Sequence, residues 1–184
     1  GRNLGSVAEL LPRILKRIAS FSRRSNHQPV TIIGWSLGGY LARELARERP
    51  DLVRQVITLG TPVVGGPKYT VVAETYRKRG IDVEAVAAEV EWRSNAARLE
   101  TPVLALYSRT DAVVAWQACI DRLTPNVEHV EVKTTHFGFG FSPEVYKIIA
   151  DAVSKTVNIQ AVNAHSQPKH RHELRLQRRR KAET

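Results

Sequence analysis

Three residues whose side chains could together support nucleophilic catalysis occur along this 184-residue chain, in the order serine, aspartate, histidine. The serine, Ser36, lies in Gly34-Trp35-Ser36-Leu37-Gly38, which matches Gly-x-Ser-x-Gly, a sharp strand-to-helix turn that presents a serine hydroxyl. This hydroxyl is a weak nucleophile until an imidazole accepts its proton, and the imidazole needs a carboxylate to fix its tautomer. We therefore expect Ser36 to be a nucleophile with both partners farther along the chain.

The residues around Ser36 have expected roles of their own. A side chain at Gly34 or Gly38 is expected to collide with the turn, and Gly39 adds a third small residue where the next helix would meet the sheet. The backbone N–H of Leu37, the residue after the nucleophile, is expected to donate a hydrogen bond to a developing oxyanion.

Two downstream residues are candidates for the acid and the base. Asp111 lies four residues beyond a predicted strand that ends at Tyr107, in a loop at the carboxyl end of the sheet, where α/β proteins collect their chemistry. His136 comes just after the last predicted strand and is the expected base. Two structural alternatives stay open: Asp111 as a turn residue that accepts backbone hydrogen bonds, and His136 as a loop-capping histidine. His129 lies inside a strand and is expected to be structural.

The hydrophobic pattern predicts short strands that alternate with helical segments. The segment 29–34 is nearly all apolar and β-branched, which indicates a strand covered on both faces and therefore a parallel sheet. Alternation of this kind predicts a doubly wound α/β fold with about four parallel strands and flanking helices. Strands are expected at 29–34, 53–59, 103–107 and 127–132, and helices at 6–24, 37–49, 116–123 and 143–153.

The segment 63–100 is too long for an ordinary connection between two strands. It contains a Gly-Gly-Pro turn and two amphipathic stretches, which we interpret as a small helical cap or lid inserted into a domain over residues 1–155. The alternative is an ordinary crossover that covers the sheet.

Composition limits the function classes that remain. Lys and Arg number 28 against 18 Asp and Glu, for a net charge of +10, and residues 165–184 contribute seven basic against two acidic side chains. We interpret 156–184 as a basic, solvated, disordered tail; the alternative is an arm for nucleic acid or anionic lipid, and no specific nucleic-acid partner is expected. No apolar run is long enough for a membrane span.

Cys119 is the single cysteine of the chain. It therefore excludes an internal disulfide and a cysteine-based zinc cluster. Neither a metal nor a cofactor is expected.

At this point the sequence resembles the α/β-hydrolase superfamily, in its esterase and lipase-like branch, over about residues 1–155. The resemblance rests on the motif at 34–39, on the segments 41–46, 55–62 and 108–114, and on His136. It implies a serine hydrolase that cleaves a small-molecule or lipid ester by acyl transfer to Ser36, with His136 as acid and base. An acyltransferase or a thioesterase with the same three residues is the nearest alternative.

The chain also departs from that family. A complete member has about eight strands, and the four that precede the elbow strand are missing here, together with the loop that supplies the second oxyanion donor. The chain has no Met and begins at Gly1, so we expect a partial α/β-hydrolase fold whose N-terminal half is supplied in cis or by a partner chain. Strand 29–34 would then be an exposed apolar edge, and a catalytically inactive, truncated hydrolase is a further alternative.

Overall fold

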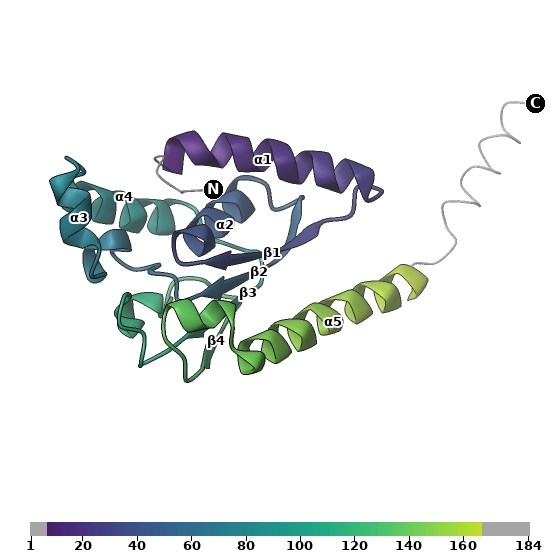
Figure 1. Ribbon diagram of the computed structural model, residues 1–184. Coiled ribbons are helices and arrows are strands. Elements are labelled where there is room, and N and C mark those ends of the chain that lie inside the picture. The colour runs from purple at the N-terminus through teal and green to yellow at the C-terminus, as the bar shows by residue number, and fades with distance from the viewer. Residues whose placement is uncertain (1–6, 167–184) are drawn as a thin grey trace, which may run out of the picture. The chain divides into compact units, whose positions relative to one another are not determined.

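The computed structural model describes residues 7–166 of the chain, with side chains described as far as residue 156. Its centre is a four-stranded parallel sheet in the order β1-β2-β3-β4, flanked by helices (Figure 1). The predicted α/β architecture with four parallel strands is therefore confirmed. The strands are β1 (Val30–Trp35), β2 (Val53–Leu59), β3 (Val103–Tyr107) and β4 (Val127–Glu131).

The helices follow the predicted alternation closely. The α-helices are α1 (Val7–Arg24), α2 (Leu37–Glu48), α3 (Ala73–Lys78), α4 (Val83–Ala96) and α5 (Pro143–Ser166), and the 3-10 turns are η1 (Gly66–Tyr69), η2 (Trp116–Cys119) and η3 (Phe137–Gly140). The helix expected over 116–123 is thus a single 3-10 turn. Helix α5 continues well past the expected end near residue 153, because no Pro or Gly interrupts the sequence between Pro143 and Pro168. Residues 167–184 of the predicted basic tail lie outside the described residues.

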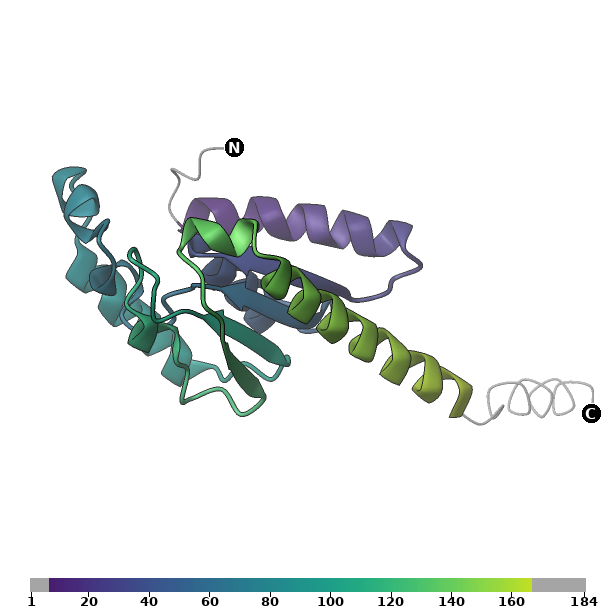
Figure 2. The ribbon, with the colours of Figure 1, turned by 60° about the horizontal axis from the view of Figure 1, so that its bottom comes forward.

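The register of the sheet brings the carboxyl ends of all four strands to one edge. Trp35 pairs with Leu59, Leu59 with Leu106, and Tyr107 with Glu131, so each strand ends level with its neighbour. The loops that follow the strands therefore meet at this edge, where open α/β sheets place their functional groups. Figure 2, turned from the view of Figure 1, shows the strands side by side.

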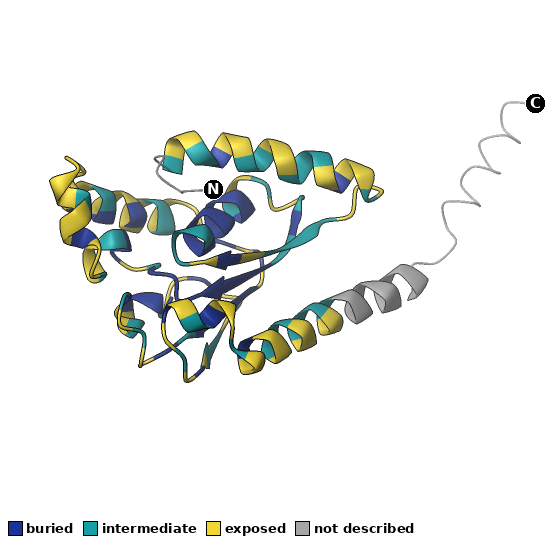
Figure 3. Ribbon diagram, viewed as in Figure 1, coloured by how far each residue is buried: buried dark blue, intermediate teal, exposed yellow. Residues whose placement is uncertain are grey.

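The core lies between the sheet and helices α1 and α2. Figure 3 shows buried residues concentrated in α2 and the central strands, whereas α1 and α3 are largely exposed. One cluster joins α1 to α2 through Leu11, Leu41 and Leu45, and the helix face predicted over 6–24 supplies the contacts of α1. A second cluster packs α2 against the sheet through Ala42, Ala46, Val53, Val56, Leu99, Val103 and Ala105. This packing fixes the start of α2, which carries the Ser-containing turn.

A buried polar network ties α2 to the loop before β4. Arg43 and Asp121 form an ion pair and are only 4% and 8% exposed. Asp121 Oδ1 also accepts the amides of Leu123 at 2.8 Å and Thr124 at 3.0 Å, and His129 Nε2 accepts the amide of Asp121 at 3.0 Å. His129 is therefore a structural residue, as the sequence predicts.

The segment 63–100, for which the sequence leaves a cap and a crossover open, carries η1, α3 and α4. Figure 1 places α3 beyond the end of the sheet to which the strands point, and α4 runs back from there toward α2. Asp82 caps α4 by accepting the amides of Glu84 and Ala85. At its other end α4 meets α2, where Arg93 pairs with Glu44 at 3.5 Å. The segment thus leaves the sheet after β2, carries η1 and α3, and returns through α4, which contacts α2 before the chain enters β3.

None of the helices within residues 7–166 has the length and apolar character that a bilayer crossing requires.

Candidate active site

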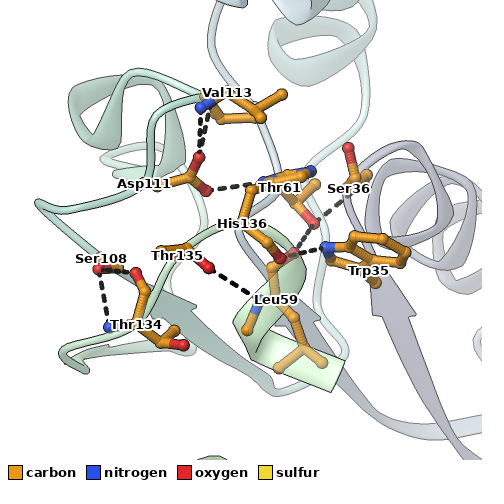
Figure 4. A network of polar contacts seen from close by, with 12 residues as sticks. Trp35, Ser36, Leu59, Thr61, Ser108, Asp111, Val113, Thr134, Thr135 and His136 are labelled. Carbon is orange, nitrogen blue, oxygen red and sulfur yellow. Dashed lines mark hydrogen bonds and ion pairs between the residues drawn. The ribbon is translucent and has the colours of Figure 1, made fainter. Parts of the chain in front are cut away.

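Ser36 occupies the turn between β1 and α2 in an uncommon backbone conformation. Its φ is 54° and its ψ is −124°, a region that non-glycine residues enter at a cost of about 1–3 kcal/mol. Two hydrogen bonds hold it there: the Ser36 amide donates to Leu59 O at 2.9 Å, and the Thr61 hydroxyl donates to Ser36 O at 3.0 Å. The end of β2 therefore clamps the turn, which is the sharp strand-to-helix connection that the motif predicts (Figure 4).

The glycines around Ser36 do not all act as the sequence suggests. A Cβ atom at Gly34 would collide with the backbone of Gly38 and Gly39, as expected. A Cβ atom at Gly38 would meet nothing within 4 Å in the described part of the chain, so the prediction of a clash there is wrong. The requirement falls instead on Gly39, where a Cβ atom would lie 2.9 Å from Gly34 O and would overlap Thr61 Oγ1. The helix meets the sheet one residue later than the motif implies.

Alanine at these two adjacent glycines should have opposite effects on stability. Gly39→Ala should lower the free energy of unfolding by about 1–3 kcal/mol, because the new methyl group overlaps the buried Thr61 hydroxyl and lies too close to the carbonyl oxygen of Gly34. Gly38→Ala should leave it unchanged or raise it by up to about 1 kcal/mol, because alanine favours the helix and fills open space. Urea unfolding followed by circular dichroism measures both, and equal losses in the two variants would contradict the geometry of the turn.

Asp111 and His136 form a pair at the carboxyl ends of the strands. Asp111 Oδ2 lies 2.7 Å from His136 Nδ1, and the two side chains are 2% and 5% exposed. The other carboxylate oxygen, Oδ1, accepts the amides of Val113 at 2.7 Å and Val114 at 2.9 Å. Asp111 is thus a turn residue and the partner of the histidine at once. A carboxylate at Nδ1 leaves Nε2 as the ring nitrogen available to accept a proton.

These contacts determine the charge of Asp111. Burial alone would favour the neutral acid, but the hydrogen bond to His136 and the amides of Val114 and Val113 outweigh it and lower the pKa of Asp111 below its usual value. Asp111 is therefore a carboxylate at neutral pH and can stabilise a positive charge on the imidazole.

Ser108 joins the loop that carries Asp111 to the loop that carries His136. Its hydroxyl donates to Thr134 O at 2.6 Å and accepts the amides of Thr134 and Thr110, both at 3.2 Å. Ser108 is 1% exposed, so these bonds are shielded from water. Ser108 thus helps to fix the spacing between the two loops (Figure 4), together with the Thr110 hydroxyl, which also donates to Thr134 O at 3.0 Å.

Two further residues contact the histidine and have no role in the sequence interpretation. Trp35 Nε1 donates to His136 O at 3.1 Å, and the two rings lie 5.3 Å apart. Gly60, at φ 52°, lies beneath the pair: a Cβ atom there would be 2.8 Å from Phe139, 2.9 Å from Asp111 Oδ2 and 3.3 Å from His136 Nδ1. The sequence carries a signal only for Gly60, since it stands in the Gly-Thr-Pro turn that ends β2.

Gly60→Ala is therefore expected to displace the pair. The added carbon takes space that the carboxylate and the imidazole occupy, and we expect the reactivity of Ser36 toward a fluorophosphonate to fall about 10- to 100-fold. Gly80→Ala is the matched control, because Gly80 also has a positive φ, of 75°, but a Cβ atom there meets nothing within 4 Å. Loss of reactivity in both variants to the same extent would mean that backbone strain, and not contact with the pair, is responsible.

Ser36 lies near the pair, but its hydroxyl is not bonded to it. Among the described residues no hydrogen bond joins Ser36 to His136, and Figure 4 draws none. Catalytic hydrogen bonds are often long without substrate and shorten when it binds. Leu37 is the first residue of α2, so its amide belongs to the group of N–H donors that has no partner within the helix.

Residues 10–78 match the family model for the α/β-hydrolase fold. They contain the Ser36 turn, the strands on both sides of it and helix α2.

Solved structures similar to this chain share its fold at low sequence identity. An α/β-hydrolase enzyme from the metagenome of lagoon sediments at Mar Chica, Morocco, is 18% identical, with a TM-score of 0.56 over 79% of this chain and 70% of that one. A lipase-esterase related protein from Clostridium acetobutylicum is 16% identical, with a TM-score of 0.60 over 85% and 79% of the two chains. A monoacylglycerol lipase from Paleococcus ferrophilus is 17% identical, with a TM-score of 0.56 over 84% and 76%.

Proposed function

This chain has the α/β-hydrolase fold, and from that fold we propose that it is a serine hydrolase that cleaves an ester through Ser36, Asp111 and His136. The observation that carries the proposal is the buried 2.7 Å contact between Asp111 and His136, two residues 25 positions apart, at the sheet edge that also holds the strained Ser36 turn. Names of the similar structures, a lipase-esterase related protein and a monoacylglycerol lipase among them, support an ester as substrate.

In the first step His136 Nε2 takes the proton of the Ser36 hydroxyl as the oxygen attacks the ester carbonyl. The carbonyl oxygen becomes an oxyanion, and the amide of Leu37 donates a hydrogen bond to it. Asp111 stabilises the imidazolium through Nδ1 and stays ionised itself. When the tetrahedral intermediate collapses, His136 returns the proton to the departing alcohol, and the acyl group remains on Ser36.

In the second step water takes the place of the alcohol. His136 removes a proton from the water, the hydroxide attacks the acyl carbonyl, and Ser36 leaves as an alcohol with the proton from His136. The products are a carboxylic acid and an alcohol. An acyltransferase or thioesterase would use the same residues, with another alcohol as acceptor or a thiol as leaving group.

In the proposed hydrolase, the segment 63–100 is the cap. The oxyanion also needs a second hydrogen-bond donor. Leu37 provides one amide, and loss of one of two donors typically costs about 10²- to 10³-fold in rate. Strand β1 is an outer strand of the four-stranded sheet and carries Ile33 and Trp35, which are 50% and 43% exposed. A further segment, in cis or from a partner chain, would cover this outer strand and bring the second oxyanion donor.

A fluorophosphonate probe tests the proposal without knowledge of the substrate. It phosphonylates a serine only where a base activates the hydroxyl, so mass spectrometry of the labelled chain should find the adduct on Ser36. A simple aryl ester should then be hydrolysed, and added alcohol should yield a new ester if the chain is an acyltransferase. Absence of an adduct on Ser36, with intact fold by circular dichroism, would support the inactive alternative and refute a hydrolase.

A further inference from the structure

We propose that the segment Tyr69–Val71 is a positioning element for Asp111, which it holds through an antiparallel bridge to residues 113–115. The inference rests on the proposed function, because Asp111 is the acid of that site. Tyr69 is the last residue of η1, and Val71 lies two residues before the start of α3, so Tyr69–Val71 belongs to the segment proposed as the cap.

The bridge consists of two backbone hydrogen bonds between segments more than 40 residues apart in the chain. The amide of Val71 donates to Val113 O at 2.9 Å, and the amide of Ala115 donates to Tyr69 O at 3.0 Å. Between them Thr70 pairs with Val114 in antiparallel orientation. The position of residues 113–115 is therefore set from outside their own loop.

The same short stretch also holds the carboxylate. Asp111 Oδ1 accepts the amides of Val113 and Val114, and Asp111 Oδ2 contacts His136 Nδ1 (Figure 4). Val113 thus uses its amide for Asp111 and its carbonyl for the bridge. A shift of the bridge moves the two amides, and the amides move the carboxylate on which the histidine depends.

The segment is anchored in turn to α4. Lys68 Nζ lies 2.7 Å from Glu84 in the first turn of α4, and the Thr70 hydroxyl donates to Pro67 O at 2.8 Å. A cavity of about 370 Å³ opens between the two bridged segments, lined by 68–71 and 111–115. A group bound in this cavity would contact both the cap segment and the loop of the acid.

Four charged or titratable groups of the described residues lie around Asp111. His136 contacts it directly, and Lys68 and Tyr69 line the same cavity. Cys119 is close enough that burial, together with the charge of Asp111, raises the pKa of its thiol to about 12. Cys119 is therefore neutral across the pH range of the experiments below. The titration of Asp111 then reports mainly on its contacts with His136 and the two amides.

Val71→Pro removes one bond of the bridge and little else. Val71 is 67% exposed, so its side chain packs against little. It is the second residue of a turn in which the Ala73 amide donates to Thr70 O, with Val72 at φ −84° and ψ −4°, and proline favours this position. Thr70, at φ −131° and ψ 153°, has the conformation that suits a residue before proline. Val71→Ala, which keeps the amide, is the control.

Ala115→Pro removes the other bond independently. Ala115 is exposed and has φ −58°, which proline adopts without strain. Ala115→Ser keeps the amide and is the control. If one proline variant does not fold, the other still decides the question.

Two readouts on the full chain test the positioning role. Carbon NMR of the Asp111 carboxyl should give a higher titration midpoint in both proline variants than in wild type and controls, because the charged form loses amide hydrogen bonds. The rate constant for fluorophosphonate labelling of Ser36 should fall about 10- to 100-fold in the proline variants and change less than about twofold in the controls. Folded proline variants with the wild-type midpoint and labelling rate would overturn the inference. If wild type itself is not labelled, the proposed function fails, while the Asp111 titration still decides whether the bridge positions the carboxylate.

Discussion

Ser36→Ala is expected to abolish fluorophosphonate labelling and to lower ester hydrolysis by about 10⁴- to 10⁶-fold. The serine oxygen forms the bond to the acyl carbon, and the residual rate comes only from binding and the oxyanion donors. The variant should stay folded, because alanine at this position keeps the backbone hydrogen bonds to Leu59 and Thr61. Initial rates with an aryl ester and intact-mass spectrometry measure the two effects.

Ser154→Ala is the matched control for this prediction. Ser154 is an exposed serine of α5 and belongs to none of the motifs or contacts on which the candidate site rests. It should be labelled to the same extent and hydrolyse the ester at the same rate as wild type. Labelling of Ser36→Ala at a second serine would place the nucleophile elsewhere and contradict the assignment.

Asp121→Ala is expected to lower the free energy of unfolding by about 3–5 kcal/mol. It removes the partner of Arg43, whose guanidinium is then left buried without a compensating charge. It also removes the hydrogen bonds that the amides of Leu123 and Thr124 donate to Asp121 Oδ1. Urea unfolding measures the loss. Asp51→Ala is the control, since Asp51 pairs with Arg49 on an exposed surface, where such pairs contribute little.

The same carboxylate makes stability depend on pH. Burial disfavours its charge, but Arg43 and the hydrogen bonds from Thr124 and Leu123 lower the pKa of Asp121 to about 2, from an ordinary value of 3.8. A folded-state pKa below the unfolded value contributes stability that is present above about pH 4 and is lost as the pH falls toward 2. The contribution is about 2 kcal/mol. The free energy of unfolding of wild type should fall by this amount between about pH 4 and pH 2, whereas that of Asp121→Asn should not. If stability falls with pH equally in the two proteins, the role of Arg43 is contradicted.

The sequence predicts much of the framework because the relevant signals are local. Strands 53–59 and 103–107 are found where segments rich in apolar and β-branched residues predict them, and Ser36 marks the turn between a strand and a helix. Asp111 and His136 follow strand ends, and parallel strands bring such positions to one edge of the sheet. Chain order and strand ends are therefore enough to nominate the candidate site.

The supporting contacts could not be predicted, because they depend on distances between loops. Nothing around Ser108 or Trp35 in the sequence indicates that one bonds Thr134 and the other the carbonyl of His136. The same holds for Gly38, which matches the motif but faces open space in the described structure, while Gly39 carries the steric requirement. Motif positions report residue types, whereas close approach depends on how the helix lies on the sheet.

The order of the strands has a consequence for synthesis of the chain. Each strand pairs with the one made just before it, so the sheet can grow by one strand at a time in a single direction as the chain emerges. The turn with Ser36 can form as soon as β2 supplies Leu59 and Thr61. The His136 imidazole, by contrast, reaches the carboxyl ends of the strands only after β4 has been made. In the proposed hydrolase, the Asp111–His136 pair that would activate Ser36 therefore forms only after β4 has joined the sheet.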